Sequence, residues 1–135
     1  MTARLAHVAV AVDDLAGARR VFSELLGLPV VHEETVADQG VHTVSLDLGG
    51  HGRIELLEPT GADTPVGRFL AKRGAGLHHL ALRVGDLVGT LERLAAAGVE
   101  LIDRQPRIGA GGCRIAFLHP RSTAGVLVEL IEASD

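Results

Sequence analysis

Residues 5–31 read LAHVAVAVDDLAGARRVFSELLGLPVV, and residues 77–102 read LHHLALRVGDLVGTLERLAAAGVELI. Each stretch begins with a short apolar segment, continues with an Asp at a position suited to a helix N-cap, and then shows the apolar spacing of a helix. When the two stretches are aligned, His7 matches His79 and Asp14 matches Asp86. The chain therefore contains a repeat, and each copy predicts a strand followed by a helix.

The predicted helices should each bury one apolar face. The spacing in both copies places suitable side chains three or four residues apart. In the first copy these are Leu15, Ala18, Val21, Phe22 and Leu25, and in the second they are Leu87, Thr90, Leu91 and Leu94.

The repeat continues beyond the helices. GRIELLEP at 52–59 resembles GVLVELIEA at 125–133, so Glu55 aligns with Glu129. Each segment follows another apolar segment across a turn rich in small and polar residues, which is typical of a hairpin. Each copy therefore predicts a strand, a helix and three further strands. We expect an α+β fold in which two repeated βαβββ modules form an eight-stranded, cleft-shaped sheet.

The domain organisation follows from this repeat. Module 1 covers about 1–61 and module 2 about 75–135, with a linking helix over about 64–73, where Pro65 suits the first turn. Neither a low-complexity segment nor a flexible linker separates the modules. We expect a single domain spanning 1–135.

Composition narrows the classes of partner. The 13 basic and 17 acidic residues give a net charge of −4, so we expect no nucleic-acid partner. Apolar runs stay shorter than a membrane span, so we expect no membrane partner. The single cysteine, Cys113, excludes an internal disulfide and is typical of a reducing compartment. A cytoplasmic protein is the expectation.

Four polar residues stand out in otherwise apolar strands. His7 and His79 occupy equivalent places, and so do Glu55 and Glu129. A twofold relation between the modules would bring two imidazoles and two carboxylates together, which suits a divalent metal such as Co, Mn, Ni or Zn. The strand around Glu129 is apolar on both sides, and a metal is one of the few partners that compensates a buried carboxylate. The alternatives are a core histidine with satisfied hydrogen bonds and a glutamate paired with an arginine.

At this point the sequence resembles the vicinal oxygen chelate superfamily and, within it, the methylmalonyl-CoA epimerase family. The resemblance covers nearly the whole chain and is carried by HVAVAVDDL, DQGV, IELLEPTGADTPVGRFLAKRGAGLHHLAL, RIGAGG and AFLHPRSTAGVLVEL. It implies a metal held by His7, Glu55, His79 and Glu129, an acyl-CoA substrate and a homodimer.

The implied reaction removes the α-proton of a malonyl-type thioester and returns a proton to the other face. A metal that binds the substrate carboxylate and the thioester oxygen would stabilise the enolate between these steps. We expect Glu129 to act as the base on one face and Glu55 on the other. Some family members carry a second catalytic Glu where this chain has Thr43, which cannot remove a carbon-bound proton.

Two motifs within the resemblance supply candidates for substrate binding. Gln39 lies in DQGV, and RIGAGG contributes Arg107, Gly109, Gly111 and Gly112. Arg107 is a candidate for the phosphates of CoA. Backbone N–H groups of the glycines could contact an anionic oxygen, although a plain hairpin turn explains the same glycines equally well.

Other functions fit the same architecture. A glyoxalase I-like isomerase has a similar ligand set, whereas a thiol transferase that acts on an antibiotic or an extradiol dioxygenase needs only two His and one Glu. A drug-binding resistance protein without metal would not need these ligands. Glu55 as a fourth ligand therefore argues against the transferase and the dioxygenase, and only the epimerase-like stretches argue against glyoxalase I. The acyl side chain stays open, because an ethylmalonyl-CoA epimerase would show the same features.

Overall fold

The computed structural model describes residues 2–133, so the domain ends predicted at residues 1 and 135 lie outside the described residues. The chain divides into two compact units. The first unit runs from His7 to His78, and the second combines the residues up to Ala6 with those from His79 onward. The division therefore cuts the chain next to each of the two aligned histidines.

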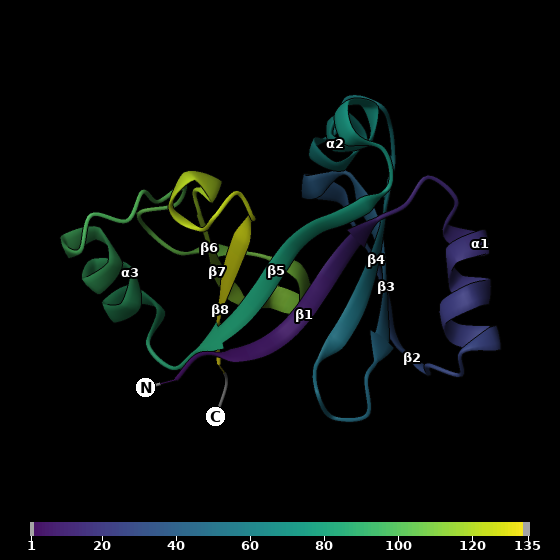
Figure 1. The fold of residues 1–135 in the computed structure, drawn as a ribbon, viewed down its shortest axis with the longest axis horizontal. Helices are drawn as coiled ribbons and strands as arrows, with labels where there is room; N and C mark the ends of the chain where they lie inside the picture. Colours follow the sequence, from purple (N-terminus) through teal and green to yellow (C-terminus); the bar gives the residue numbers. More distant parts are fainter. Residues whose placement is uncertain (1, 134–135) are drawn as a thin grey trace. The chain divides into compact units, whose positions relative to one another are not determined.

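The first unit contains four neighbouring strands of the eight-stranded sheet, in the order β2-β3-β4-β1 (Figure 1). β1 pairs with β4 in parallel, and the other pairs are antiparallel. β1 starts within the second unit, and its residues from His7 onward belong to the first. In chain order the elements are β1 (Arg4–Ala11), α1 (Leu15–Arg19), the π-helix η1 (Arg20–Leu25), β2 (Val30–Val36), the 3₁₀ turn η2 (Ala37–Gln39), β3 (Val41–Asp47), β4 (Arg53–Pro59) and α2 (Pro65–Arg73).

The second unit repeats this arrangement in the order β5-β8-β7-β6, again with the first strand parallel to the last. The βαβββ repeat predicted from the sequence is therefore confirmed. Its elements are β5 (Gly76–Val84, of which the residues from His79 onward belong to this unit), α3 (Leu87–Ala96), β6 (Arg107–Ile108), the 3₁₀ turn η3 (Ala110–Gly112), β7 (Arg114–Leu118), the 3₁₀ turn η4 (Pro120–Ser122) and β8 (Val128–Glu132).

The first helix of each unit begins at the aspartate that the sequence indicated. The carboxylate of Asp14 accepts a hydrogen bond from the Gly17 amide, and that of Asp86 accepts one from the Gly89 amide, each at 3.0 Å. A Cβ at either glycine would lie less than 2.5 Å from this carboxylate. Both caps are therefore confirmed, and in each the carboxylate lies close over a glycine three residues into the helix.

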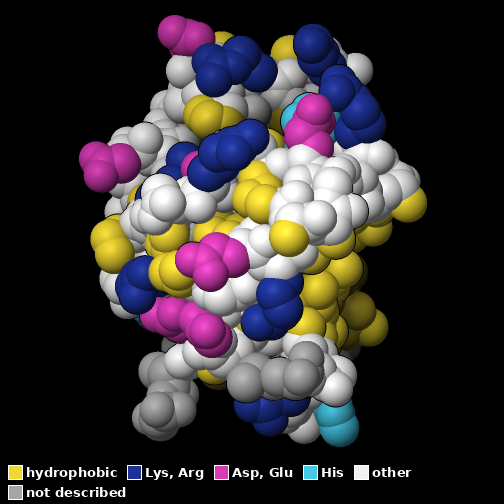
Figure 2. All heavy atoms as spheres, turned by 90° about the vertical axis from the view of Figure 1, so that its left-hand side faces the viewer, with side chains coloured by type: hydrophobic (Ala, Val, Ile, Leu, Met, Phe, Trp, Pro, Cys, Tyr) yellow, Lys and Arg dark blue, Asp and Glu magenta, His cyan; other side chains and the backbone are white. Residues whose placement is uncertain are grey.

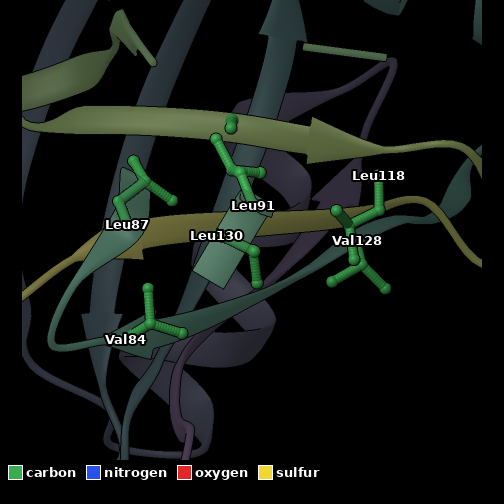
Figure 3. Close-up of a cluster of buried hydrophobic side chains, with 7 residues drawn as sticks. Val84, Leu87, Leu91, Leu118, Val128 and Leu130 are labelled. Carbon is green, nitrogen blue, oxygen red and sulfur yellow. The ribbon is translucent and has the colours of Figure 1, made fainter. Parts of the chain in front are cut away.

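In the second unit, α3 packs on one face of the sheet (Figure 3). Leu87 and Leu91 of the helix meet side chains from three strands, because alternate strand residues point to the same face. The remaining labelled members are Val84, Leu118, Val128 and Leu130. This face is consequently filled by apolar packing and leaves the opposite face for other residues.

The corresponding helix of the first unit departs from expectation. Leu15, Ala18 and Phe22 pack against the sheet as predicted, but Val21 and Leu25 are 47% and 63% exposed. The reason is that the helix widens after Arg19 into a π-helix, in which the Leu26 amide donates to the Val21 carbonyl five residues back. The wider turn breaks the three-and-four spacing on which the prediction of one apolar face rested.

The opposite face of the first unit's sheet is partly covered by α2. Val66, Phe69 and Leu70 of this helix pack against Ala9, Ala11, Val41 and Leu57. Within residues 2–133, the helices are all too short or too polar to cross a membrane.

Candidate functional site

One histidine–glutamate pair lies in the first unit. Nδ1 of His7 on β1 is 3.0 Å from Oε2 of Glu55 on β4. The parallel ladder places Ala9 beside Glu55, so His7, two residues earlier on β1, points to the same face of the sheet as the glutamate. Both side chains are largely buried.

An equivalent pair lies in the second unit. Nε2 of His79 on β5 is 3.1 Å from Oε1 of Glu129 on β8. The ladder again places an alanine, Ala81, beside the glutamate. Glu129 is only 7% exposed, which agrees with the burial that its apolar strand predicted.

The donor chemistry of both pairs fits a divalent metal. Each pair offers an imidazole nitrogen and a carboxylate oxygen, the ligand types that first-row divalent ions accept. Each carboxylate is withdrawn from water, where an ionised group needs a strong partner. Neutral imidazole and ionised carboxylate are the forms of these side chains that bind a metal.

The residues beside the two glutamates differ between the units. Ser45 lies directly opposite Glu55 on β3, whereas Phe117 lies directly opposite Glu129 on β7. The Phe117 ring meets the His79 ring edge to face, with 6.0 Å between the ring centroids. One unit therefore places a small hydroxyl beside its pair, and the other places an aromatic ring there.

Thr43 lies on the same face of the first unit as Glu55, two residues from Ser45 on β3. Its hydroxyl donates to the backbone carbonyl of Glu34 at 3.3 Å. Glu34 is the ladder partner of Thr43, and its carboxylate lies 3.0 Å from Nε2 of His32. The sequence alone did not single out the carboxylate of Glu34. Pairing the two strands of this hairpin so that Glu34 lies opposite Thr43 would have placed it on the same face as Glu55.

The glycine-rich RIGAGG segment forms β6 and the turn η3. Gly111 and Gly112 have φ angles of +70° and +75°, which favour glycine. A Cβ on Gly109 would lie 2.5 Å from Cδ1 of Ile115. The amides of Gly109 and Gly112 both donate within this loop. Turn geometry and close packing thus account for all three glycines, and binding of an anion would be an additional role.

Arg107 leans over Phe117. Its Cζ lies 5.1 Å from the ring centroid, and its Nε lies 3.2 Å from Oδ2 of Asp103. The same oxygen of Asp103 accepts the Phe117 backbone N–H at 2.8 Å. The guanidinium is therefore fixed from two sides. Gln39, the remaining predicted binding residue, ends η2 in the first unit.

Basic and acidic side chains are mixed on the face drawn in Figure 2. Several arginines of the second unit are engaged in ion pairs, such as Arg114 with Glu132 and Arg121 with Glu100. These pairs are solvent-exposed and contribute little to stability individually.

Comparisons with known proteins agree with this geometry. Residues 6–117 match the family model of the glyoxalase/bleomycin resistance protein/dioxygenase superfamily. The chain is 39% identical to the mitochondrial methylmalonyl-CoA epimerase of Bos taurus, over 96% of this chain and 74% of the relative. It is also 39% identical to the ethylmalonyl-CoA/methylmalonyl-CoA epimerase of Cereibacter sphaeroides, over 96% of this chain and 98% of the relative. A solved methylmalonyl-CoA epimerase in complex with methylmalonyl-CoA and NH4+ is similar with a TM-score of 0.91 and 35% identity, covering 99% of this chain and 96% of the other.

Proposed function

Because the chain belongs to the glyoxalase/bleomycin resistance protein/dioxygenase superfamily and, within it, to the methylmalonyl-CoA epimerases, we propose that it epimerises methylmalonyl-CoA or a close acyl-CoA analogue. Such an enzyme is an isomerase of the racemase and epimerase type. The observation that carries the proposal is the equivalent His–Glu pair in each unit, in a chain whose named epimerase relatives align over almost its whole length.

In this proposal one divalent metal is held by His7, Glu55, His79 and Glu129. His7 and Glu55 belong to one unit and His79 and Glu129 to the other, and each unit supplies one nitrogen and one carboxylate ligand. The covalent chain supports the use of both pairs. His7 follows Ala6 of the other unit directly, and His79 follows His78 of the other unit directly. Neighbouring Cα atoms are about 3.8 Å apart. When bound, the metal would act as a Lewis acid toward the substrate oxygens.

The protein's own part in the reaction is proton transfer. The carboxylate of Glu129 accepts the α-proton, and the electron pair of the broken C–H bond moves toward the thioester oxygen. On the opposite face, Glu55 passes a proton from water to the same carbon, and the electron pair returns to form the new C–H bond. Glu129 then releases the proton it accepted to water, so both glutamates return to the ionised form. Positioned acid–base groups of this kind contribute about 10²–10⁴-fold to a rate.

Gln39 and the loop residues Gly109, Gly111 and Gly112 are assigned to substrate binding in the same proposal. A homodimer and a cytoplasmic location also stay predictions. Light scattering of the purified protein at several concentrations would test the dimer, since a constant mass of one chain would contradict it.

The test is exchange of the α-proton in D2O, followed by NMR with methylmalonyl-CoA and ethylmalonyl-CoA. We expect exchange above the rate without enzyme, together with interconversion of the two epimers. The ratio of rates identifies the acyl side chain. The hemithioacetal of methylglyoxal and glutathione tests the glyoxalase alternative, and turnover of this compound without α-proton exchange would overturn the proposal.

A further inference from the structure

A guanidinium lies next to the histidine–glutamate pair of the second unit, separated from it by a single phenyl ring. One face of Phe117 meets Arg107, whose Cζ is 5.1 Å from the ring centroid, and its ring also contacts His79 edge to face. Phe117 is the ladder partner of Glu129. Strand alternation places Arg107 on this same face, because its own ladder partner, Ile115, is two residues from Phe117.

The guanidinium is held in position without being neutralised on all sides. The ion pair with Asp103 is made through Nε, which is one of five N–H donors on the group. Within residues 2–133, no second acidic side chain pairs with Arg107, and its side chain is 52% exposed. A fixed fork with remaining donors is the arrangement that binds a carboxylate through two parallel hydrogen bonds.

The chemistry of the substrate identifies the anion that such a fork would meet. A malonyl-type thioester carries a free carboxylate directly on the reacting carbon. The phosphates of CoA lie beyond the two amide units of pantetheine, far from that carbon. A guanidinium one ring away from His79 is therefore suited to the carboxylate and not to the phosphates.

We infer that Arg107 binds the free carboxylate of the substrate and thereby selects malonyl-type thioesters over uncharged ones, an inference that rests on the proposed function. It replaces the role in phosphate binding that sequence reasoning gave to Arg107. A carboxylate has two oxygens, so one can accept hydrogen bonds from Arg107 while the other would remain free for a metal. The positive charge also offsets the repulsion between this carboxylate and the negative charge that develops on the neighbouring enolate.

Asp103 has a positioning role in this scheme. The same oxygen contacts Nε of Arg107 and accepts the Phe117 backbone N–H, so the carboxylate ties the guanidinium to β7. Asp103→Asn keeps an oxygen that can accept this N–H but loses the charge that orients the guanidinium.

Binding of malonyl-CoA and acetyl-CoA, which differ only by the carboxylate, tests the inference by calorimetry at one fixed metal content. For Arg107→Gln we expect malonyl-CoA affinity to fall at least about tenfold, the scale for losing a hydrogen bond to a charged group, and acetyl-CoA affinity to stay within about twofold. Arg107→Lys should fall in between, because it keeps the charge and loses the fork. Asp103→Asn should lower malonyl-CoA affinity selectively but by less than Arg107→Gln.

Arg114→Gln is the matched control, since it removes the same charge from the neighbouring strand on the opposite face of the sheet. It should leave both affinities unchanged. If Arg107→Gln lowers the affinity for both ligands equally, the side chain binds the CoA moiety and the inference is overturned. It is also overturned if neither affinity changes, or if the wild type does not bind malonyl-CoA. Arg107→Lys and circular dichroism separate a binding defect from misfolding.

The outcome is distinguishable from failure of the proposed function. A wild type that prefers malonyl-CoA through Arg107 but does not exchange the α-proton of methylmalonyl-CoA would refute epimerisation and leave the carboxylate site standing. If the wild type epimerises methylmalonyl-CoA but Arg107→Gln lowers the affinity for both ligands equally, the proposed function stands and the carboxylate site is refuted.

Discussion

Ser45 and Phe117 occupy equivalent places in the two units, each directly opposite the glutamate of its own histidine–glutamate pair. The repeat is therefore symmetric in its pairs and asymmetric in what surrounds them. The second unit has an apolar ring with a guanidinium over it beside its glutamate, and the first unit has a small buried hydroxyl there. The two copies of a duplicated scaffold have in this way acquired different chemical surroundings for the same pair.

Phe117→Leu tests the role of the ring. The change keeps most of the apolar volume, so we expect stability to fall by less than about 1.5 kcal/mol. It removes the aromatic face under Arg107, a contact worth about 0.5–2 kcal/mol, so the preference for malonyl-CoA over acetyl-CoA should weaken. Phe69→Leu is the control, because Phe69 carries the similar Arg73 contact on α2. Equal effects of both substitutions on this preference would contradict the role.

Glu129→Gln should abolish epimerisation and leave much of the metal affinity. Glutamine still offers an oxygen ligand, but it cannot accept the α-proton, so the rate should fall about 10²–10⁴-fold. Exchange of the α-proton and metal titration, measured on the same preparation, check both halves of this prediction. Near-normal exchange in a metal-loaded variant would place the base outside the ligand set.

Glu55→Gln separates two accounts of the second proton transfer. If Glu55 returns the proton, the substitution should reduce epimerisation strongly while exchange on the Glu129 side continues. Nearly full activity would mean that another group or water supplies the proton. Glu34 is then the next residue to substitute, because its carboxylate lies on the same face, beside Thr43.

Removal of the metal should lower thermal stability as well as activity. A ligand at a hundred times its dissociation constant stabilises the folded state by about 2.7 kcal/mol, so chelation should lower the Tm and added Co or Mn should restore it. His7→Ala and His79→Ala should each abolish this response. His51→Ala, a change at an exposed turn, should keep it. Elemental analysis that finds no divalent metal, with no response to added ions, would rule out the site.

The two N-caps should contribute equally to stability. Asp14→Ala and Asp86→Ala each remove one hydrogen bond of 3.0 Å to a helix amide, at a cost of about 1 kcal/mol. Urea unfolding followed by circular dichroism measures this loss. Asp13→Ala, one residue before the first cap, should change stability by less than about 0.5 kcal/mol. A similar loss for Asp13→Ala would show that charge and not capping is responsible.

Much of the fold could be predicted because the signals within each copy of the repeat are local in the sequence. The alternation of apolar residues in the strands, the Asp at each helix start and the alignment of Glu55 with Glu129 all lie within short stretches of sequence. The π-helix at Arg20–Leu25 could not be predicted in this way, because spacing rules assume a regular α-helix.

The candidate site was harder to predict wherever it depended on strand register. Aligned histidines and glutamates identify the pairs, but their partners across the ladder come from hairpins whose register the sequence leaves open. That is why the place of Glu34 beside Thr43 could not be predicted from the sequence, and the same holds for Arg107. Its place over Phe117 becomes visible only once β6 is paired with β7.

The packing of Ala6 sets an order on the folding of this chain. Ala6 packs with Ile115 and Ile131, which come far later in the sequence. Closing a contact over so long a stretch of chain costs entropy, so this cluster should form late. A gene split between His78 and His79 would consequently yield a second piece that lacks Ala6, and restoring residues 2–6 to that piece should improve its solubility.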